Sequence, residues 1–367
     1  MQILAVDIGT GTQDVLLFDT SREPENALKM VLPSPTRLLG AAVRAATLAG
    51  EDVLLTGVTM GGGPSTWAVD EHLAAGRRVY ATPDAARTFN DDLDEVGEMG
   101  VQVVSEDEAA GVSGVRRLEM RDFGYRALAR AFANFNVDLD TVDVLALAVF
   151  DHGAAPPGVS DRLFRFEYLA ERLGTGRGLA SFAFVRDEIP PIMTRLQAVA
   201  ATAPPERTVV VMDTAPAAVL GATEDPAVRA QKGAAVVANV GNMHTLAFHL
   251  CGGRIAGLFE HHTGLLNREE LERLLVELPA GTIDHEALFA HHAHGALLLD
   301  PDAACCELDF LALTGPRRGM LAGSELRPYL AVPYGDMMMA GCWGMVRACA
   351  EVLPWTAEEI EGALRGA

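Results

Sequence analysis

The feature that most constrains the fold of this chain is a strand–turn–strand unit that occurs twice. The first unit has apolar runs at 3–7 and 14–18 around a Gly/Thr turn, and the second has them at 234–240 and 245–250 around a Gly/Asn turn. Short β-rich runs alternate with helical stretches elsewhere, which is typical of α/β proteins. The repeat predicts two α/β lobes, each of which begins with one hairpin.

The chain of 367 residues is long enough for two domains. We expect the first lobe at 1–231, with an acidic insertion near 81–114, and the second lobe at 232–335. C-terminal helices are expected at 336–367, and the first of them is predicted to return to the first lobe. The hydrophobic share of 49% provides an ample core.

The charge balance narrows the range of partners. The 50 acidic residues outnumber the 29 basic ones, and the formal net charge of −21 disfavours nucleic acids and anionic membranes. The longest apolar run, 144–150, is far shorter than the ~20 residues of a membrane helix, and no basic region of a signal peptide is visible. We therefore expect a cytoplasmic protein whose partners are a nucleotide and an unknown small molecule or protein.

The five cysteines exclude one kind of chemistry. Cys251, Cys305, Cys306, Cys342 and Cys349 form no C-x2-C pair and no group of three suited to an iron–sulfur cluster. Their spacing fits a reducing compartment. We interpret them as buried, inert thiols.

The first hairpin carries the strongest chemical signal. Asp7 ends an apolar strand, and the turn after it offers Gly9, Thr10, Gly11, Thr12 and Gln13 as phosphate-binding residues. Small residues let backbone N–H groups approach a phosphate, and hydroxyl groups add donors. A carboxylate at the strand end suits hydrated Mg²⁺ held against the phosphates. The alternative is a tight hairpin with an acidic end.

The second hairpin and a later segment supply matching pieces. The second turn offers the phosphate-binding candidates Asn239, Gly241, Asn242, His244 and Thr245. Two such hairpins could hold a polyphosphate from both sides. Farther along, a strand near 311–313 leads into Gly315, Pro316 and Arg317, which suit an adenosine, with Arg317 stacking on the base or meeting a phosphate.

In this order the motifs resemble those of the actin/sugar-kinase/heat-shock-chaperone ATPase superfamily. Residues 7–13 are similar to its first phosphate motif, 239–245 to its second, 211–215 to its first connecting motif, 314–317 to its adenosine motif and 336–349 to its second connecting helix. The resemblance implies an α/β fold of two ribonuclease-H-like lobes with a nucleotide cleft between them. It also implies ATP and Mg²⁺ as cofactors, with Asp7 as a Mg²⁺ ligand and Asp213 as a ligand through water.

More narrowly, the chain resembles a prokaryotic family labelled pyruvate formate-lyase-activating enzyme. The similarity lies in 7–14, in Asp151-His152-Gly153, in Gly241-Asn242 with His244-Thr245, and in 260–264. A radical activase of that name needs an iron–sulfur cluster, and the cysteine spacing argues against one.

Three residues are candidates for acid–base catalysis. Asp151 and His152 follow the apolar strand 144–150, and the carboxyl ends of strands in α/β sheets border crevices. Asp151 is the first candidate for a general base and Glu260 the second; the alternative for Asp151 is a cap on the following loop. Glycines 61–63 form a further turn, interpreted as an acceptor contact or a plain strand-to-helix turn.

Eight of the ten histidines lie between 244 and 294. Neighbours in a strand point to opposite faces, so only one of His261 and His262 is expected to face the cleft. On a helix, His291 and His294 share a face. One hypothesis is a transition metal held by His261 or His262, by His294 and by His152, and the alternative is a set of solvated or core histidines.

Two functions remain open. The first is a Mg-ATP-dependent transferase acting on a small molecule, of the phosphotransferase or the acyl/carbamoyl type. The second is a nucleotide-gated switch that assists or activates a partner protein with little hydrolysis. Asn239, which stands where the superfamily has an aspartate, favours the switch, because asparagine is a poor base and a weaker Mg²⁺ ligand.

Overall fold

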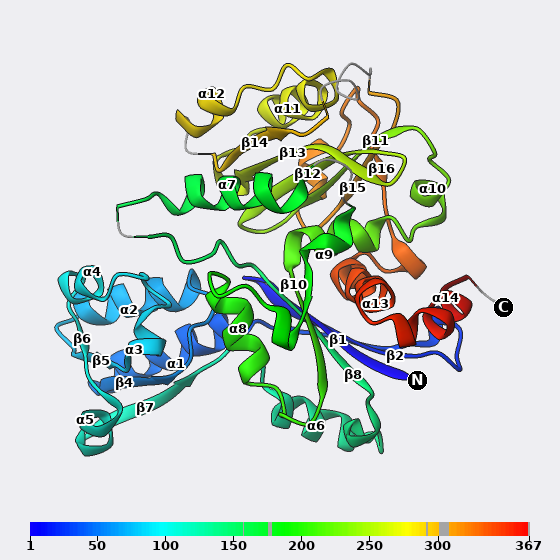
Figure 1. Cartoon of the computed structure of the whole chain (residues 1–367). Helices are drawn as coiled ribbons and strands as arrows, with labels where there is room; N and C mark the ends of the chain where they lie inside the picture. Colours follow the sequence, from blue (N-terminus) through cyan, green and yellow to red (C-terminus); the bar gives the residue numbers. More distant parts are fainter. Residues whose placement is uncertain (157, 175–177, 291–292, 301–307, 366–367) are drawn as a thin grey trace.

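The computed structural model describes residues 1–156, 158–174, 178–290, 293–300 and 308–365. They form two lobes, each built on a six-stranded sheet, and a smaller unit with a four-stranded sheet. Figure 1 shows the second lobe above, the first lobe below and the small unit at the lower left. Two helices, α9 (Thr214–Ala222) and α13 (Ala340–Val352), pack in a shared core between the two large sheets.

The first lobe has the strand order β3-β2-β1-β8-β10-β9. β1 pairs antiparallel with β2 and parallel with β8, which pairs parallel with β10. An antiparallel meander extended by parallel strands is the ribonuclease-H-like arrangement. The strands are β1 (Gln2–Ile8), β2 (Thr12–Asp19), β3 (Leu28–Pro33), β8 (Val144–Val149), β9 (Ala183–Val185) and β10 (Thr208–Asp213).

Side chains on β1 alternate between two cores, as the two-residue period of a strand requires. Ile3 and Ala5 face the layer of α9 and α13, whereas Leu4 and Val6 face a second core on the opposite side of the sheet. The helices of that opposite side are α6 (Tyr125–Ala133) and α8 (Thr194–Ala201). Burial on both faces explains why the first apolar run of the sequence is nearly continuous.

The second lobe repeats this design in the order β14-β13-β12-β11-β15-β16. β11 pairs antiparallel with β12 and parallel with β15, so the expected pair of ribonuclease-H-like lobes is confirmed. α11 (Arg268–Ala280) and α12 (His285–Ala290) cover its outer face. The strands are β11 (Ala234–Val240), β12 (His244–Cys251), β13 (Arg254–His262), β14 (Gly295–Leu298), β15 (Leu311–Thr314) and β16 (Tyr329–Leu330).

The small unit is inserted between β3 and β8 and has a parallel sheet of order β6-β5-β4-β7. The acidic segment near 81–114 lies within this unit, which begins earlier, at α1. Several of its acidic residues cap short helices: Asp92 accepts from the Asp94 N–H, and Ser105 and Glu108 form a capping box. The elements are α1 (Pro35–Ala49), β4 (Asp52–Gly57), α2 (Pro64–Ala74), β5 (Val79–Ala81), α3 (Pro83–Ala86), α4 (Leu93–Glu98), β6 (Val101–Val103), α5 (Glu106–Gly111) and β7 (Val115–Met120).

The C-terminal helices begin later than the sequence pattern predicts. The expected helix at 336–349 starts as a 3-10 turn at Met337–Met339, where the Asp336 carboxylate accepts from the Met338 N–H, and α13 begins only at Ala340. α13 packs against β1 and β8 of the first lobe as well as against α9.

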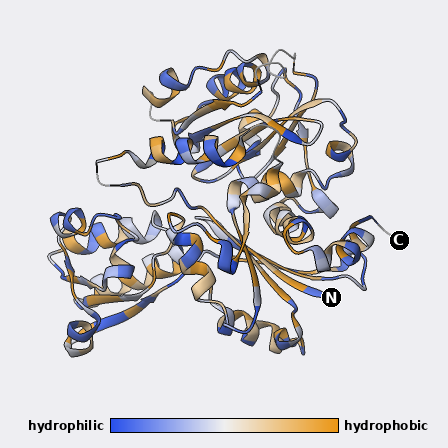
Figure 2. Cartoon of the chain, in the orientation of Figure 1, coloured by the Kyte–Doolittle hydropathy of each residue, from blue (hydrophilic) through white to orange (hydrophobic). Residues whose placement is uncertain are grey.

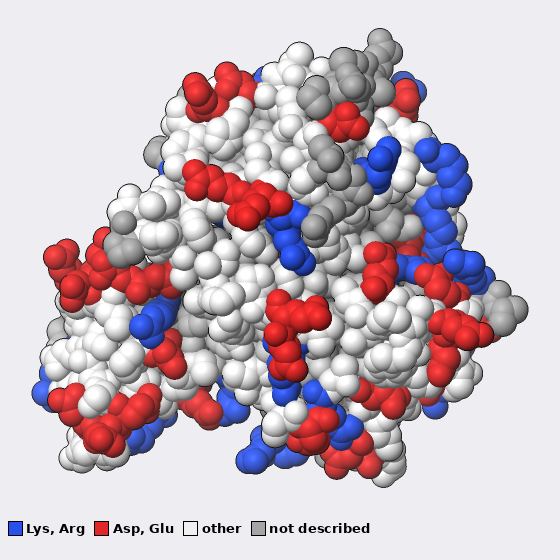
Figure 3. Space-filling view, viewed as in Figure 1, with Lys and Arg blue, Asp and Glu red and all other residues white. Residues whose placement is uncertain are grey.

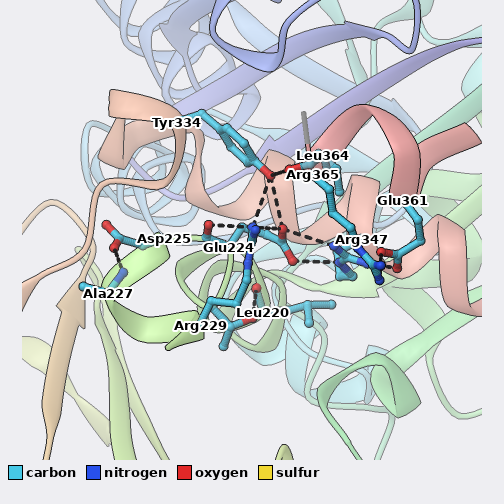
Figure 4. A network of polar contacts seen from close by, with 11 residues as sticks. Leu220, Glu224, Asp225, Ala227, Arg229, Tyr334, Arg347, Glu361, Leu364 and Arg365 are labelled. Carbon is cyan, nitrogen blue, oxygen red and sulfur yellow. Dashed lines mark hydrogen bonds and ion pairs between the residues drawn. The ribbon is translucent and has the colours of Figure 1, made fainter. Parts of the chain in front are cut away.

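A polar network fixes α13 and α14 (Ala357–Arg365) to the region between α9 and α10 (Pro226–Arg229), as Figure 4 shows. The Glu224 carboxylate accepts from Arg347 Nε at 2.7 Å and from Arg229 Nη2 at 2.6 Å. Tyr334 donates its hydroxyl to Glu224 at 3.2 Å, and Arg347 also pairs with Glu361 on α14. The network attaches the two C-terminal helices, α13 and α14, to the end of α9, the helix that follows β10.

The hydrophobic and the acidic residues lie in different parts of the molecule. Figure 2 shows the hydrophobic colour concentrated on the strands of the lobes, and Figure 3 shows Asp and Glu side chains spread in several patches over the visible face. Among the described residues, no helix combines the length and the apolar character that crossing a membrane requires.

Candidate functional site

The candidate site is a cavity of about 380 Å³ between the lobes. Both hairpin turns, the starts of α9 and α13 and the loop before α2 contribute to its wall. Of the residues singled out from the sequence, the wall contains Asp7, Gly9, Thr10, Thr12, His152, Asn239, Gly241, Asn242, His244, Gly315 and Pro316. The wall does not include Gly11, Gln13, Asp151, Asp213, Thr245, Glu260, His261, His262, His294 or Arg317.

The first hairpin turn is closed by its own backbone and anchored by one serine. The Gly9 N–H donates to the Thr12 carbonyl at 2.9 Å, and the Ser34 hydroxyl donates to the Thr10 carbonyl at 2.7 Å. Gln13 points out of the cavity, because its amide donates to the Pro33 carbonyl at 3.1 Å. The turn therefore presents glycine and threonine groups to the cavity.

The second turn meets the first. The Gly241 N–H donates to the His244 carbonyl at 3.0 Å, which closes the turn. A Cβ on Gly11 would lie only 2.6 Å from the Asn242 Nδ2, so the turns of the two lobes are in contact. Thr245 is buried behind them, where its hydroxyl lies 3.0 Å from the Thr263 hydroxyl.

The predicted adenosine segment is divided by the structure. Gly315 and Pro316 lie in the cavity wall. Arg317 is exposed outside it, and its backbone N–H donates to the Val240 carbonyl at 3.0 Å. The backbone of this residue ties the segment to the second hairpin, while its side chain is not placed to stack on a base in the cavity.

Two carboxylates lie side by side beneath the first turn. Asp7 of β1 is paired in register with Asp14 of β2, and both line the cavity. The Thr214 hydroxyl donates to Asp7 Oδ1, whereas Asp14 Oδ1 has no hydrogen-bond partner among the residues that the structure describes. A Cβ on Gly341 would lie 1.9 Å from Asp7 Oδ2, so α13 can approach the carboxylate only as glycine.

The electrostatics of this pair fit a bound cation. Burial raises the pKa of Asp7 to about 7, and burial together with the charge of Asp7 raises the pKa of Asp14 to about 8. Two buried carboxylates with an unpartnered oxygen are the donors that Mg²⁺ prefers. The sequence pattern missed Asp14, although a hairpin registered at Asp7 would have placed the two residues opposite each other.

Asp213 is engaged by the protein itself. Its Oδ1 accepts from the Ala215 N–H at 3.1 Å, which caps α9, and its Oδ2 accepts from Arg165 at 2.9 Å. Burial is the first cause of a raised pKa for Asp213. Each oxygen thus already accepts a hydrogen bond from the protein, and Asp213 does not line the cavity.

The catalytic candidates separate in the structure. His152 lines the cavity, whereas Asp151 is buried behind it and accepts from the N–H groups of Gly153 and Leu196, both at 2.8 Å. Burial raises the pKa of the Asp151 carboxyl. Asp151 fixes the loop that carries His152, as the capping alternative describes, and does not reach the cavity as a base.

Arg165 on α7 (Asp161–Leu173) is a central residue that the sequence pattern did not reveal. Its side chain is 3% exposed, and it joins Asp213 of the first lobe at 2.9 Å to Glu260 of the second lobe at 2.8 Å. It also donates to the Asp151 carbonyl at 2.7 Å. Glu260, the second candidate base, is therefore a buried ion-pair partner, and the charge of Arg165 lowers its pKa against the effect of burial.

The histidines divide as strand alternation predicts. His262 faces His244 and His294, with ring centroids 5.0 and 4.6 Å away. His261 is buried on the other face of β13, where its Nδ1 lies 3.0 Å from the His262 carbonyl oxygen. His261 is therefore not part of the cluster, and its third member is His244 in place of the expected His152. His291 and His292 lie outside the described residues.

Of the three cysteines that the structure describes, two agree with the interpretation as buried thiols. Cys342 and Cys349 are buried in α13, where burial raises the pKa of each thiol, to about 12 for Cys349. Cys251 ends β12 and is partly exposed. Cys305 and Cys306 lie outside the described residues.

A duplicated ribonuclease-H-like lobe with a cleft between the copies defines the class of this protein: it has the fold of the actin/sugar-kinase/heat-shock-chaperone superfamily. The particular family follows from a family model. Residues 60–320 match the family described as "Putative pyruvate format-lyase activating enzyme (DUF1786)", and the chain belongs to that family. The family resemblance seen in the sequence is thereby confirmed.

Comparison with individual proteins adds little. No curated protein matches the chain. Among solved structures it is similar to an inorganic polyphosphate/ATP-glucomannokinase from Arthrobacter sp. strain KM, with 12% identity, 95% of this chain and 99% of that chain covered, and a TM-score of 0.34. It is also similar to a ROK hexokinase from Thermus thermophilus (16% identity, 95% of this chain and 98% of that chain covered, TM-score 0.29) and to the ethanolamine utilization protein EutJ from Carboxydothermus hydrogenoformans (10% identity, 94% and 89% covered, TM-score 0.29). Likenesses at this level carry no statement about what this chain binds.

Proposed function

We propose that this protein binds Mg-ATP in the cleft and transfers a phosphoryl group from it to a small molecule. The observation that carries the proposal is the contact of the two hairpin turns above the paired carboxylates of Asp7 and Asp14. Backbone N–H groups at turns, threonine hydroxyls and a buried pair of carboxylates are the groups that a magnesium–polyphosphate requires.

Each part of the nucleotide has a place in this proposal. Gly9, Thr10 and Thr12 hold the phosphates from the first lobe, and Gly241 and Asn242 hold them from the second. Gly315 and Pro316 border the adenosine. Asp7 and Asp14 would hold Mg²⁺ directly and Asp213 through water, and the ion would offset the charge of the polyphosphate.

The small unit supplies the wall for the acceptor. Gly61, Gly62 and Thr66 line the cavity together with Arg195, whose guanidinium is held by Asp122 at 2.7 Å. In the proposed step, an acceptor hydroxyl oxygen forms a bond to the γ-phosphorus while the bond from that phosphorus to the β,γ-bridging oxygen breaks. The bonding electrons leave with ADP, and the acceptor proton is released to water. His152 lines the cavity, but desolvation lowers its pKa to about 3, so it is a weak proton acceptor.

A nucleotide-gated switch is the second candidate function. Asn239 lies in the cavity wall at the position of the superfamily's aspartate, and its amide offers neither a base nor a charged ligand. In this case nucleotide would close the lobes and a partner protein would respond to the closed form.

Calorimetric titration of Mg-ATP into the wild type and Asp7→Asn tests the binding step. We expect near-unit stoichiometry for the wild type and loss of binding in the variant. Absence of binding by folded wild type would overturn both functions. Where the wild type binds Mg-ATP, turnover stimulated by a small hydroxyl compound would support the transferase. Turnover stimulated only by a protein would support the switch.

A further inference from the structure

Three imidazoles meet at one end of the second lobe's sheet. His244 begins β12 and is paired in register with His262 at the end of β13. His294 immediately precedes β14, and its backbone N–H donates to the Glu260 carbonyl at 3.1 Å. The ring centroids of the three histidines are 4.6 to 5.0 Å apart, and one ring nitrogen of each lies within 4.8 Å of the others.

A buried carboxylate supports this cluster from behind. Glu260 is fully buried, and its Oε1 lies 3.3 Å from Nδ1 of His244 and 3.6 Å from Nδ1 of His294. Its other oxygen is held by Arg165 at 2.8 Å. The carboxylate is therefore fixed in a position where it faces two of the three rings.

The cluster contains polar atoms that find no partner among the described residues. Glu260 Oε1, His244 Nδ1 and both ring nitrogens of His294 are buried and make no hydrogen bond of standard geometry with that part of the chain. Leaving a buried polar group unpaired costs about 1–3 kcal/mol, so a concentration of such atoms requires an explanation. A ligand on Nε2 of His294 provides one, because it pairs that atom and leaves the Nδ1–H groups of His244 and His294 to donate to Glu260.

We propose that His244, His262 and His294 bind one divalent transition-metal ion, with Glu260 orienting the rings of His244 and His294. Three histidines with a fourth position left open form the ligand set of catalytic zinc sites. A metal-bound histidine commonly donates its other ring N–H to a carboxylate, which is the place that Glu260 takes. Imidazole nitrogens suit zinc, iron, nickel and copper, whereas Mg²⁺ prefers oxygen ligands.

Packing restrains one of the three rings. His244 stacks on Phe150 at 4.2 Å, which holds its ring in the cluster.

The site adjoins the nucleotide cleft without sharing its carboxylates. His244 lies in the cavity wall, whereas His262 and His294 lie behind it. The open position can therefore take water or an oxygen atom of a molecule in the cavity. This site is distinct from the Asp7–Asp14 pair, and the inference does not rest on the proposed use of ATP.

The test is titration of Zn²⁺ and Co²⁺ into untagged, chelator-treated full-length protein in the presence of excess Mg²⁺. We expect one ion per chain and, for Co²⁺, the strong visible absorption of a four- or five-coordinate site. His262→Gln and His294→Gln should each weaken binding by at least about tenfold, because each removes one of three ligands. His261→Asn is the matched control, since it changes the neighbouring buried histidine on the other face of the strand, and it should bind as the wild type does.

Several results would overturn the assignment. One is a folded wild type that binds no Zn²⁺ or Co²⁺ when Mg²⁺ is in excess. Others are wild-type affinity in both glutamine variants, or equal loss in His261→Asn. Thermal unfolding and Mg-ATP binding of each metal-free variant establish that the fold is intact, so failure of the metal site and failure of the nucleotide site are read separately.

Discussion

Gly221 of α9 and Gly344 of α13 face each other where the two helices cross between the lobes. A Cβ on Gly221 would lie 1.7 Å from the Ala340 carbonyl oxygen, and a Cβ on Gly344 would lie 1.8 Å from the Ala217 carbonyl oxygen. The helices therefore touch backbone to backbone, and no side chain fits between them.

The first prediction concerns this crossing. Gly344→Ala should lower the free energy of unfolding by about 1–3 kcal/mol, because the new methyl group forces the backbones apart. Urea unfolding measures the change. Gly362→Ala on α14 is the matched control: apart from its chain neighbours and its own helix backbone, no described atom lies within 4 Å of its Cβ position, so the alanine should stabilise the helix by up to about 1 kcal/mol. Equal stability of Gly344→Ala and wild type would contradict the packing described here.

The second prediction concerns Asp14. Asp14→Asn should weaken Mg-ATP binding by at least about tenfold, or 1.4 kcal/mol, because it removes one of two charged oxygen ligands. Calorimetry compares the variant with Asp19→Asn, which changes a carboxylate at the far end of the same strand, outside the cavity wall. Unchanged affinity in Asp14→Asn would remove Asp14 from the ion site.

The third prediction concerns Arg165. Arg165→Met should destabilise the protein by about 3–5 kcal/mol, because Asp213 and Glu260 are left buried without their shared partner. Denaturant unfolding gives the size of the loss. Adding Glu260→Gln to this variant should recover part of it, since one uncompensated charge is removed. Glu260→Gln alone completes the comparison. If the loss of stability in the double variant equalled the sum of the losses in the two single variants, the two residues would not be coupled.

The fourth prediction concerns pH and His72 in the small unit. His72 is fully buried, and its Nδ1 lies 2.7 Å from the Thr47 hydroxyl. Burial lowers its pKa against the smaller opposing effects of a hydrogen bond with the Arg78 backbone and of the Asp52 charge. Below its ordinary pKa of 6.5 the unfolded chain binds a proton that the folded chain does not, so stability falls as the pH falls through that value. His72→Gln should make the free energy of unfolding change less with pH between about pH 7.5 and about pH 5.5, by at most about 1.4 kcal/mol per pH unit. Equal slopes for variant and wild type would show that another group dominates this window.

Local patterns account for what the sequence revealed. The two hairpins depend on short apolar runs and turn glycines, so both were visible, and strand alternation separated His262 from His261. The histidine cluster was only half visible, because the meeting of His244 with His294 depends on the register of three strands. Arg165 was invisible for a related reason: its partners lie 48 and 95 residues away, and nothing local in α7 distinguishes it from a surface arginine.

The position of Arg165 has a consequence for how the two sites behave together. One guanidinium neutralises Asp213, beside the proposed magnesium ligands, and Glu260, behind the histidine cluster. A cation bound at one site would attract the carboxylate beside it and weaken the pairing of that carboxylate with Arg165. Arg165 would then pair more strongly with the carboxylate on the other side. The binding free energies of the two ions are then not independent, and reciprocity requires that each ion alter the affinity for the other by the same factor.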